Sequence, residues 1–209
     1  MAKLGPDQIS ALRTETPNAR ARDFAASLGI TEADLVAAFV GTTATVVTPH
    51  PDRLLPWIGR LGEVMALTRN EGCVHERVGT YLDYRSGAHG AMVLGPEIDL
   101  RVFAKHWVHA FAVEEASPDG PKRSPQVFDA AGDAVHKVHL KPQSNHALWP
   151  DLLANMRLEG QPQTLTLSPR RPVDPARANR DSAPALRAAW DRMTDTHQFI
   201  GLAKDHGMN

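Results

Sequence analysis

The sequence of 209 residues has a single cysteine, no excess of either charge and no long apolar run. One thiol excludes a disulfide framework and a cysteine-rich zinc site within one chain. Lys and Arg number 23 against 24 Asp and Glu, so bulk charge gives no support for nucleic-acid binding. No 18-residue apolar stretch occurs, so we expect no membrane span. The first ten residues carry no apolar signal segment, which predicts a cytoplasmic protein.

Motifs for common chemistries are also missing. The sequence contains no P-loop, no Gly-x-Ser-x-Gly and no Gly-x-Gly-x-x-Gly, so bound nucleotides and a serine nucleophile gain no support. Cys73 has no local partner that marks it as activated, and we interpret it as a small buried apolar residue.

Histidine, in contrast, is abundant, with ten residues. The pairs His106/His109 and His136/His139 are each three residues apart. A helix would place such a pair on one face, whereas a strand sends the two rings to opposite faces and spoils chelation. Since we place these residues in strands, we interpret most histidines as solvent-facing or hydrogen-bonded sheet residues.

Helical signals occupy the start of the sequence. Segments 6–16 and 19–28 read as short helices, the second followed by Gly29 as a stop signal. Thr31 and Asp34 resemble a capping box before the apolar run 35–40.

Short β-type segments fill the middle of the sequence. We predict these strands at 43–47, 63–68, 74–81, 91–94, 98–103, 107–114, 126–128 and 135–140. A helix is predicted at 52–61, between the first two strands, and the other gaps are the size of turns. Without helix-length crossovers between them, they favour an antiparallel meander.

The tail returns to helix. Helices are predicted at 146–158, at 182–193 and from near 194 to 207, with a Pro- and Arg-rich linker near 161–181. We therefore predict a single domain, 1–209, of the α+β class: a large antiparallel β-sheet flanked by N-terminal and C-terminal helices.

His197 is the first candidate for chemistry. Thr194 and Asp195 can cap the following helix, which leaves His197 in its first turn. The positive end of the helix dipole disfavours imidazolium there, so the ring stays neutral and can ligate a metal. Apolar side chains, among them Trp190 and Phe199, surround it in sequence. Such a histidine suits a haem iron, and a capped, structural histidine is the alternative.

Arg101 is the second candidate. In a strand over 98–103, Ile98, Leu100 and Val102 face one way and Asp99, Arg101 and Phe103 the other. One interpretation is a surface ion pair with Asp99, which is worth little. The other is a cation beside an aromatic ring, facing a ligand carboxylate or a polarised oxygen.

Several blocks of the sequence resemble the haem-utilisation factors HemS, ChuS and HmuS, also called haemin-degrading factors. The blocks keep the order and spacing of that family and are Thr68-Arg69-Asn70-Glu71, Val74-His75-Glu76-Arg77-Val78-Gly79 with Tyr81, Ile98-Asp99-Leu100-Arg101, Trp107-Val108-His109-Ala110-Phe111, the run 128–138 and the run 190–199. The resemblance extends from near residue 20 to the end of the sequence.

The resemblance implies a cytoplasmic protein that binds haem b and carries or sequesters imported haem for iron use, with a haem importer or a haem oxygenase as partner. The alternative that it implies is an enzyme that opens the porphyrin ring with an external reductant. The family's proximal ligand falls on His197 and its distal arginine on Arg101. Both candidate residues therefore coincide with family positions.

The sequence resembles only the N-terminal half of typical members, which contain two tandem halves. Related short haem carriers are homodimers that mimic this arrangement. The resemblance therefore predicts a homodimer in which a second subunit completes the haem site; an open site or a companion protein are the alternatives.

Overall fold

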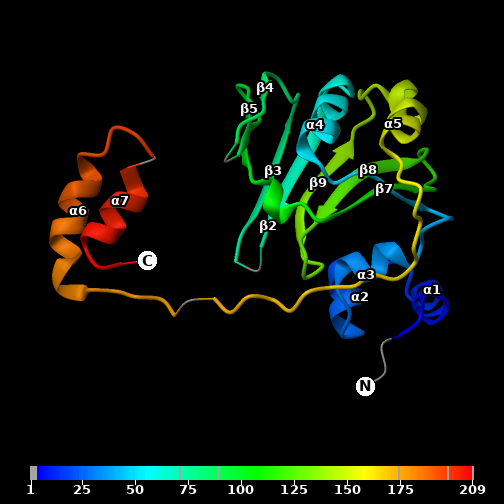
Figure 1. Ribbon diagram of the computed structural model, residues 1–209, viewed down its shortest axis with the longest axis horizontal. Helices are drawn as coiled ribbons and strands as arrows, with labels where there is room; N and C mark the ends of the chain where they lie inside the picture. Colours follow the sequence, from blue (N-terminus) through cyan, green and yellow to red (C-terminus); the bar gives the residue numbers. More distant parts are fainter. Residues whose placement is uncertain (1–3, 71, 89, 174, 197, 209) are drawn as a thin grey trace. The chain divides into compact units, whose positions relative to one another are not determined.

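The protein, described by a computed structural model, falls into two compact units, a larger unit of residues 1–170 and a C-terminal unit of residues 171–209 (Figure 1). The structure describes residues 4–208 except 71, 89, 174 and 197. The boundary lies inside the predicted linker. Between 161 and 179, the described residues form no helix or strand, as the prolines led us to expect.

Three short helices open the larger unit: α1 (Pro6–Glu15), α2 (Ala21–Ser27) and α3 (Glu32–Ala37). The predicted capping box of α3 is confirmed. The backbone N–H of Asp34 donates to the Thr31 hydroxyl at 3.0 Å, and the Thr31 N–H donates to the Asp34 carboxylate at 3.2 Å. Two otherwise unpaired donors at the start of α3 are thereby satisfied.

The main sheet has six antiparallel strands in the order β1-β7-β8-β9-β2-β3. Their bounds are Ala44–Val46 (β1), Val64–Arg69 (β2), Val74–Gly79 (β3), His109–Glu115 (β7), Lys122–Phe128 (β8) and Ala134–Leu140 (β9). The α+β class and the large antiparallel sheet are confirmed. The predicted meander is wrong, because β2 pairs with β9 and β1 with β7. Helix α4 (Pro51–Arg60) connects β1 to β2 across the sheet.

A second, three-stranded sheet was not expected. It has the order β4-β5-β6, with bounds Tyr84–Arg85, Ala91–Leu94 and Asp99–Val102. The β5 and β6 segments were predicted as strands of the large sheet. Strand β4 has only two residues, too few for an alternating pattern to reveal it.

The core lies on both faces of the main sheet. Neighbouring residues of β7 alternate: Ala110 and Ala112 join one apolar cluster, and Phe111 and Val113 another. The first cluster receives α4, α5 (Trp149–Met156) and residues of the small sheet, while α3 covers the second (Figure 1).

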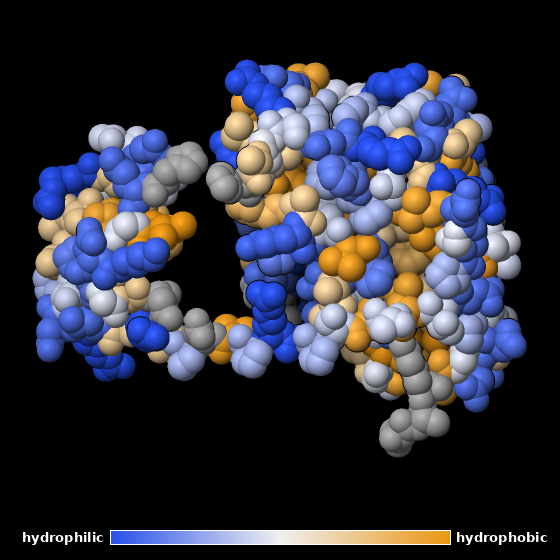
Figure 2. Space-filling view, viewed as in Figure 1, coloured by the Kyte–Doolittle hydropathy of each residue, from blue (hydrophilic) through white to orange (hydrophobic). Residues whose placement is uncertain are grey.

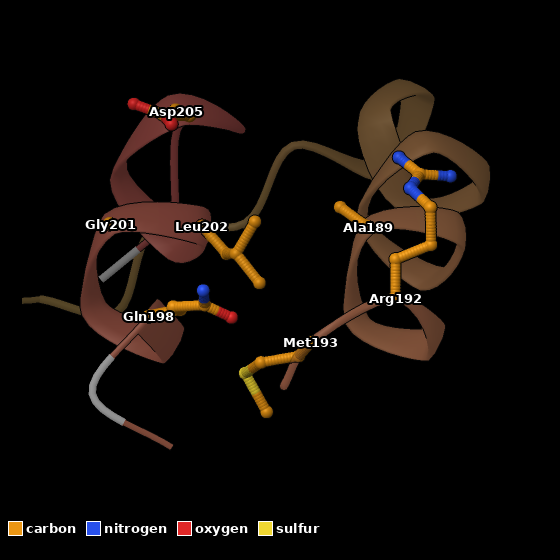
Figure 3. A pocket seen from close by; sticks show the side chains of 7 residues that line it. All are labelled: Ala189, Arg192, Met193, Gln198, Gly201, Leu202 and Asp205. Atoms are coloured by element: carbon orange, nitrogen blue, oxygen red, sulfur yellow. The ribbon is translucent and has the colours of Figure 1, made fainter. Parts of the chain in front are cut away.

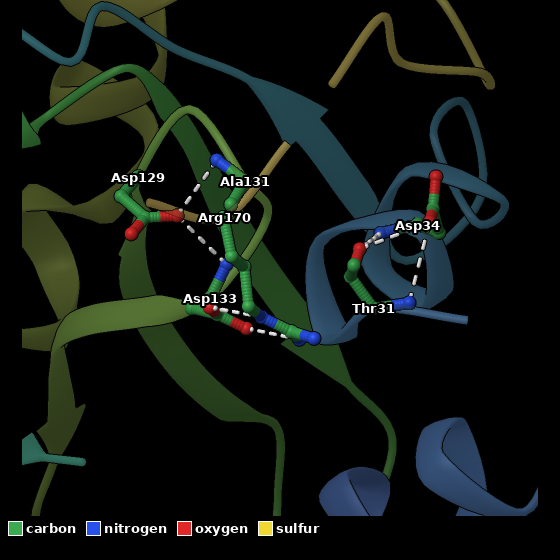
Figure 4. A network of polar contacts seen from close by, with 6 residues as sticks. All are labelled: Thr31, Asp34, Asp129, Ala131, Asp133 and Arg170. Atoms are coloured by element: carbon green, nitrogen blue, oxygen red, sulfur yellow. Dashed lines mark hydrogen bonds and ion pairs between the residues drawn. The ribbon is translucent and has the colours of Figure 1, made fainter. Parts of the chain in front are cut away.

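The loop between β8 and β9 fixes the first part of the linker to the larger unit (Figure 4). The carboxylate of Asp129 accepts hydrogen bonds from the backbone N–H groups of Ala131 and Asp133, at 2.9 and 3.0 Å. Asp133 in turn accepts two hydrogen bonds from the Arg170 guanidinium, both at 2.7 Å. This fork geometry holds Arg170 in one orientation.

The C-terminal unit holds two helices, α6 (Ala183–Asp191) and α7 (Gln198–Asp205), as predicted but with shorter bounds. The rings of Trp190 and Phe199 meet edge to face, 5.3 Å between centroids. Both rings remain nearly half exposed and Ile200 is more exposed still, and Figure 2 shows hydrophobic residues at the surface of this unit. None of the helices in the described part of the chain is long and apolar enough to cross a membrane.

Candidate functional site

A cavity of about 120 Å³ lies where the main sheet meets the small sheet. Strands β2, β6 and β9 contribute to it, together with the segment that follows β6. Its walls are Thr68, Leu100, Arg101, Val102, Phe103, His106, Trp107, Val135 and His136. This volume admits a polar group of a few atoms or one edge of a larger ligand, because sites for whole small molecules are several times larger.

Arg101 lies on this cavity, on the face of β6 that the alternating pattern predicted. Ile98 and Val102 are buried, while Asp99, Arg101 and Phe103 are exposed. The Arg101 guanidinium donates to the Asp99 carboxylate, so the predicted surface ion pair exists. Because Arg101 also lines the cavity, the ion pair does not exclude a role toward a ligand.

A buried histidine forms the inner wall of the cavity. His136 is 4% exposed and contacts two hydroxyl groups: Nε2 lies 2.5 Å from the Tyr81 hydroxyl, and Nδ1 lies 2.8 Å from the Thr68 hydroxyl. The Trp107 ring stacks on the imidazole at 6.0 Å between centroids. This network joins Thr68 of β2, His136 of β9 and Tyr81, which lies two residues after the end of β3.

Burial sets the protonation state of this network. Desolvation lowers the pKa of His136 to about 4, and a smaller contribution comes from His139. Desolvation also raises the pKa of Tyr81 far above its ordinary value. The imidazole is therefore neutral and the phenol protonated at neutral pH.

Sequence reasoning missed this network. His136 was noticed only as half of a spaced pair, and its partners are 55 and 68 residues away in sequence. The alternation of β9 was a usable signal, because His136 shares a face with the apolar Val138.

The other sequence-based interpretations have mixed outcomes. His136 and His139 point to opposite faces of β9, as predicted, whereas His106 lies in the 3₁₀ turn Ala104–His106 and not in a strand. The prediction that Cys73 is buried is wrong: the thiol is exposed, beside a turn closed by Asn70. Among residues 4–208 without 71, 89, 174 and 197, no three His, Cys, Asp or Glu side chains gather as a metal site.

His197 lies outside the described residues. For this candidate the structure describes only the residues next to it in sequence. The backbone N–H of Gln198 donates to the Asp195 carbonyl at 3.1 Å, and the Thr194 N–H donates to the Gln198 side chain at 3.1 Å. Among the described residues, helix α7 spans Gln198–Asp205 and so follows His197 in sequence.

A second pocket, of about 430 Å³, lies between α6 and α7. Ala189 of α6 and Leu202 of α7 point toward each other across it, with Met193 and Gln198 below (Figure 3). Arg192 and Asp205 add charge to its walls, so this pocket joins apolar and ionic groups close in sequence to His197.

Comparisons with known proteins identify the family. Residues 29–156 match the family described as the haemin-degrading HemS.ChuX domain. The chain is 36% identical over 197 residues to the hemin transport protein HmuS of Yersinia pestis, a match that covers 94% of this chain and 56% of the relative.

Two solved structures share the fold over nearly all of this chain. Holo-PhuS, a heme-binding protein from Pseudomonas aeruginosa, is 43% identical, with a TM-score of 0.82 over 98% of this chain and 61% of that one. ChuS, described as an E. coli heme oxygenase, is 32% identical, with a TM-score of 0.71 over 93% of this chain and 57% of that one.

The chain thus spans little more than half the length of these relatives, and nearly all of it matches them. The match includes the main sheet, the small sheet and the cavity beside Arg101. This chain belongs to the haemin-degrading HemS.ChuX domain family.

Proposed function

We propose that the chain binds haem b and carries or sequesters it for iron use in the cytoplasm, with residues 1–209 acting as one haem-utilisation domain. The observation that carries the proposal is the cavity beside Arg101. It presents a cation next to the exposed Phe103 ring and, on its inner wall, the neutral His136 ring with both nitrogens hydrogen-bonded. A cation beside aromatic surface suits a flat apolar ring that bears carboxylates.

His197 is proposed as the axial ligand of the iron and Arg101 as the distal polar group. The half-exposed rings of Trp190 and Phe199 flank position 197 in sequence and offer apolar surface to a porphyrin. When bound, the iron of haem supplies an open coordination position that a neutral imidazole can fill. Homology with a heme-binding protein 43% identical in sequence supports this assignment.

A haem titration of the full chain tests the proposal. The wild type should give a saturable Soret band, and His197→Ala should lose it or shift it. His206→Ala, in the same unit, is the matched control and should leave the band unchanged. A spectrum identical in His197→Ala and the wild type would contradict the ligand assignment, and a titration without saturation would contradict haem binding itself.

The second candidate function is haem cleavage, which the 32% identity to a protein described as a heme oxygenase favours. Porphyrin opening needs electrons from an external reductant. The haem complex should then release a bilin-like product in proportion to bound haem when reductant and catalase are both present. A Soret band that stays stable under these conditions favours the carrier.

We also propose that a second copy of the chain completes the haem site. The cavity beside Arg101 encloses far less volume than a porphyrin occupies, so further walls are needed. Sedimentation with and without haem tests this homodimer. A monomer in the haem-loaded state would contradict it and point to a companion protein, such as the haem importer or haem oxygenase that exchanges haem with this chain.

A further inference from the structure

The Tyr81–His136–Thr68 network has a defined direction. Within the described part of the chain, the Tyr81 hydroxyl bonds only to His136, and Tyr81 is 5% exposed. If Nε2 donated to Tyr81, the phenol hydrogen would be left buried without an acceptor, which is costly. Tyr81 therefore donates to Nε2, and the neutral ring carries its hydrogen on Nδ1.

The direction of the Tyr81–His136 hydrogen bond determines whether the Thr68 hydroxyl donates or accepts toward His136. Nδ1–H donates to the Thr68 hydroxyl, which therefore acts as acceptor on its inner side. Among the residues that the structure describes, Oγ1 of Thr68 has no second hydrogen-bond partner. Its own hydrogen is free to be donated, and Thr68 lines the same cavity as Arg101. The network thus turns Thr68 into an oriented donor at the cavity wall.

We propose that this cavity binds a carboxylate group, which accepts one hydrogen bond from the Thr68 hydroxyl and a charge-assisted one from Arg101. Two donors on one small cavity match the two oxygens of a carboxylate. His136 and Tyr81 are then positioning residues, which act through Thr68. The inference deepens the proposed function by naming the ligand group that this cavity takes.

Asp99 competes with such a ligand. Its carboxylate already accepts from the Arg101 guanidinium, and its side chain is 62% exposed. A bound carboxylate would share the guanidinium with Asp99 or displace it. Asp99→Asn should therefore raise the affinity of the cavity for an anion, a gain of function that a damaged fold would not produce.

Formate is the probe for the cavity, because it needs no haem and fits the volume. Formate titration of the full chain, followed by NMR at the Thr68 amide and the His136 ring, should saturate. Thr68→Val should bind about tenfold more weakly, since one hydrogen bond to a charged group is lost. Thr68→Ser should stay within about twofold, and Asp99→Asn should bind more tightly.

Tyr81→Phe tests the positioning role separately. It leaves Thr68 and Arg101 in place, but removes the donor that fixes the tautomer of His136. The Nδ1–H signal of His136 should weaken, and formate affinity should fall, although by less than in Thr68→Val. No saturable formate shift in the wild type, or equal affinity in Thr68→Val and the wild type, would overturn the inference.

The carboxylate has two sources, a propionate of haem or a free small acid. Haem and haem dimethyl ester separate them. If the propionate enters the cavity, the wild type prefers haem to the ester and Thr68→Val loses this preference. If both proteins show the same preference while formate binding depends on Thr68, the cavity takes a free acid. If the protein binds formate but not haem, the proposed haem-binding function is rejected and the carboxylate site is not.

Discussion

The Tyr81 hydroxyl lies 2.5 Å from Nε2 of His136, inside the larger unit and away from water. Because burial lowers the pKa of this imidazole to about 4, the folded protein keeps it neutral where an unfolded chain would protonate it. Between pH 6.5 and pH 4 the unfolded state binds the extra proton, so stability rises with pH across this window.

We therefore expect acidification to destabilise the protein. His136 alone should account for a loss of about 2 kcal/mol in the free energy of unfolding between pH 7 and pH 5. His139 and His109, whose pKa values burial also lowers, add in the same direction. Urea unfolding at the two pH values measures the loss, and His136→Gln should show a smaller one. Equal losses in the variant and the wild type would contradict the assignment.

A buried carboxylate joins α3 to the sheet. Glu32 accepts hydrogen bonds from Arg69 of β2 and Lys137 of β9, and all three side chains are 10–13% exposed. Glu32→Gln leaves two buried cations without their counter-charge, so we expect a loss of about 3 kcal/mol in the free energy of unfolding. Asp99→Asn, which breaks an exposed pair, is the control and should cost less than about 1 kcal/mol.

Gly132 sits in the loop that anchors Arg170, with φ +84°, and a Cβ there would lie 2.5 Å from the Thr31 hydroxyl. Gly132→Ala should therefore destabilise the protein in two ways: the backbone is strained at this φ, and the new Cβ clashes with Thr31, the N-cap of α3. We expect a total loss of about 2–4 kcal/mol in the free energy of unfolding.

Gly120→Ala is the matched control for this substitution. Gly120 also has a positive φ, +105°, but no atom lies within 4 Å of its built Cβ. Only the backbone strain remains, so we expect a loss of about 1 kcal/mol. Thermal unfolding of both variants separates the cost of backbone strain from the cost of the clash with Thr31. Equal melting temperatures in the two variants would show that this clash does not destabilise the protein.

The edge strand β1 is partly covered by a side chain. The Gln161 amide accepts from the Val46 N–H and donates to the Val46 carbonyl, each at 2.9 Å, in the manner of a paired strand. Gln161→Leu should expose the Val46 N–H, cost about 1 kcal/mol and speed hydrogen exchange at this amide. Gln163→Leu should leave exchange at Val46 unchanged, since Gln163 bonds to Val40.

The boundaries of most elements were readable from the sequence because local rules set them. The capping box at Thr31 and Asp34, the alternation of Asp99, Arg101 and Phe103, and the prolines of the linker each act over a few residues. Strand β4 was not predicted, because two residues are too few to show an alternating pattern. Cys73 was placed wrongly, because the sequence pattern did not show that this residue lies in the connection between β2 and the edge strand β3, away from the core.

The candidate site was only partly readable. Arg101 was identified from its strand face and from the family resemblance, and the structure places it on a cavity. Its neighbours on that cavity were not identified, because Thr68 and His136 meet only through the pairing of β2 with β9. The role of His197 stays a prediction.

The sequence by itself determined the α+β class, the helical ends and most strand segments, and it predicted Arg101 and His197 as site residues. The tertiary structure decided the strand order, the second sheet, and the burial of His136 between Tyr81 and Thr68. The physical reason is range: capping, turns and alternation depend on neighbours along the chain, whereas pairing and burial depend on residues that only the folded core brings together.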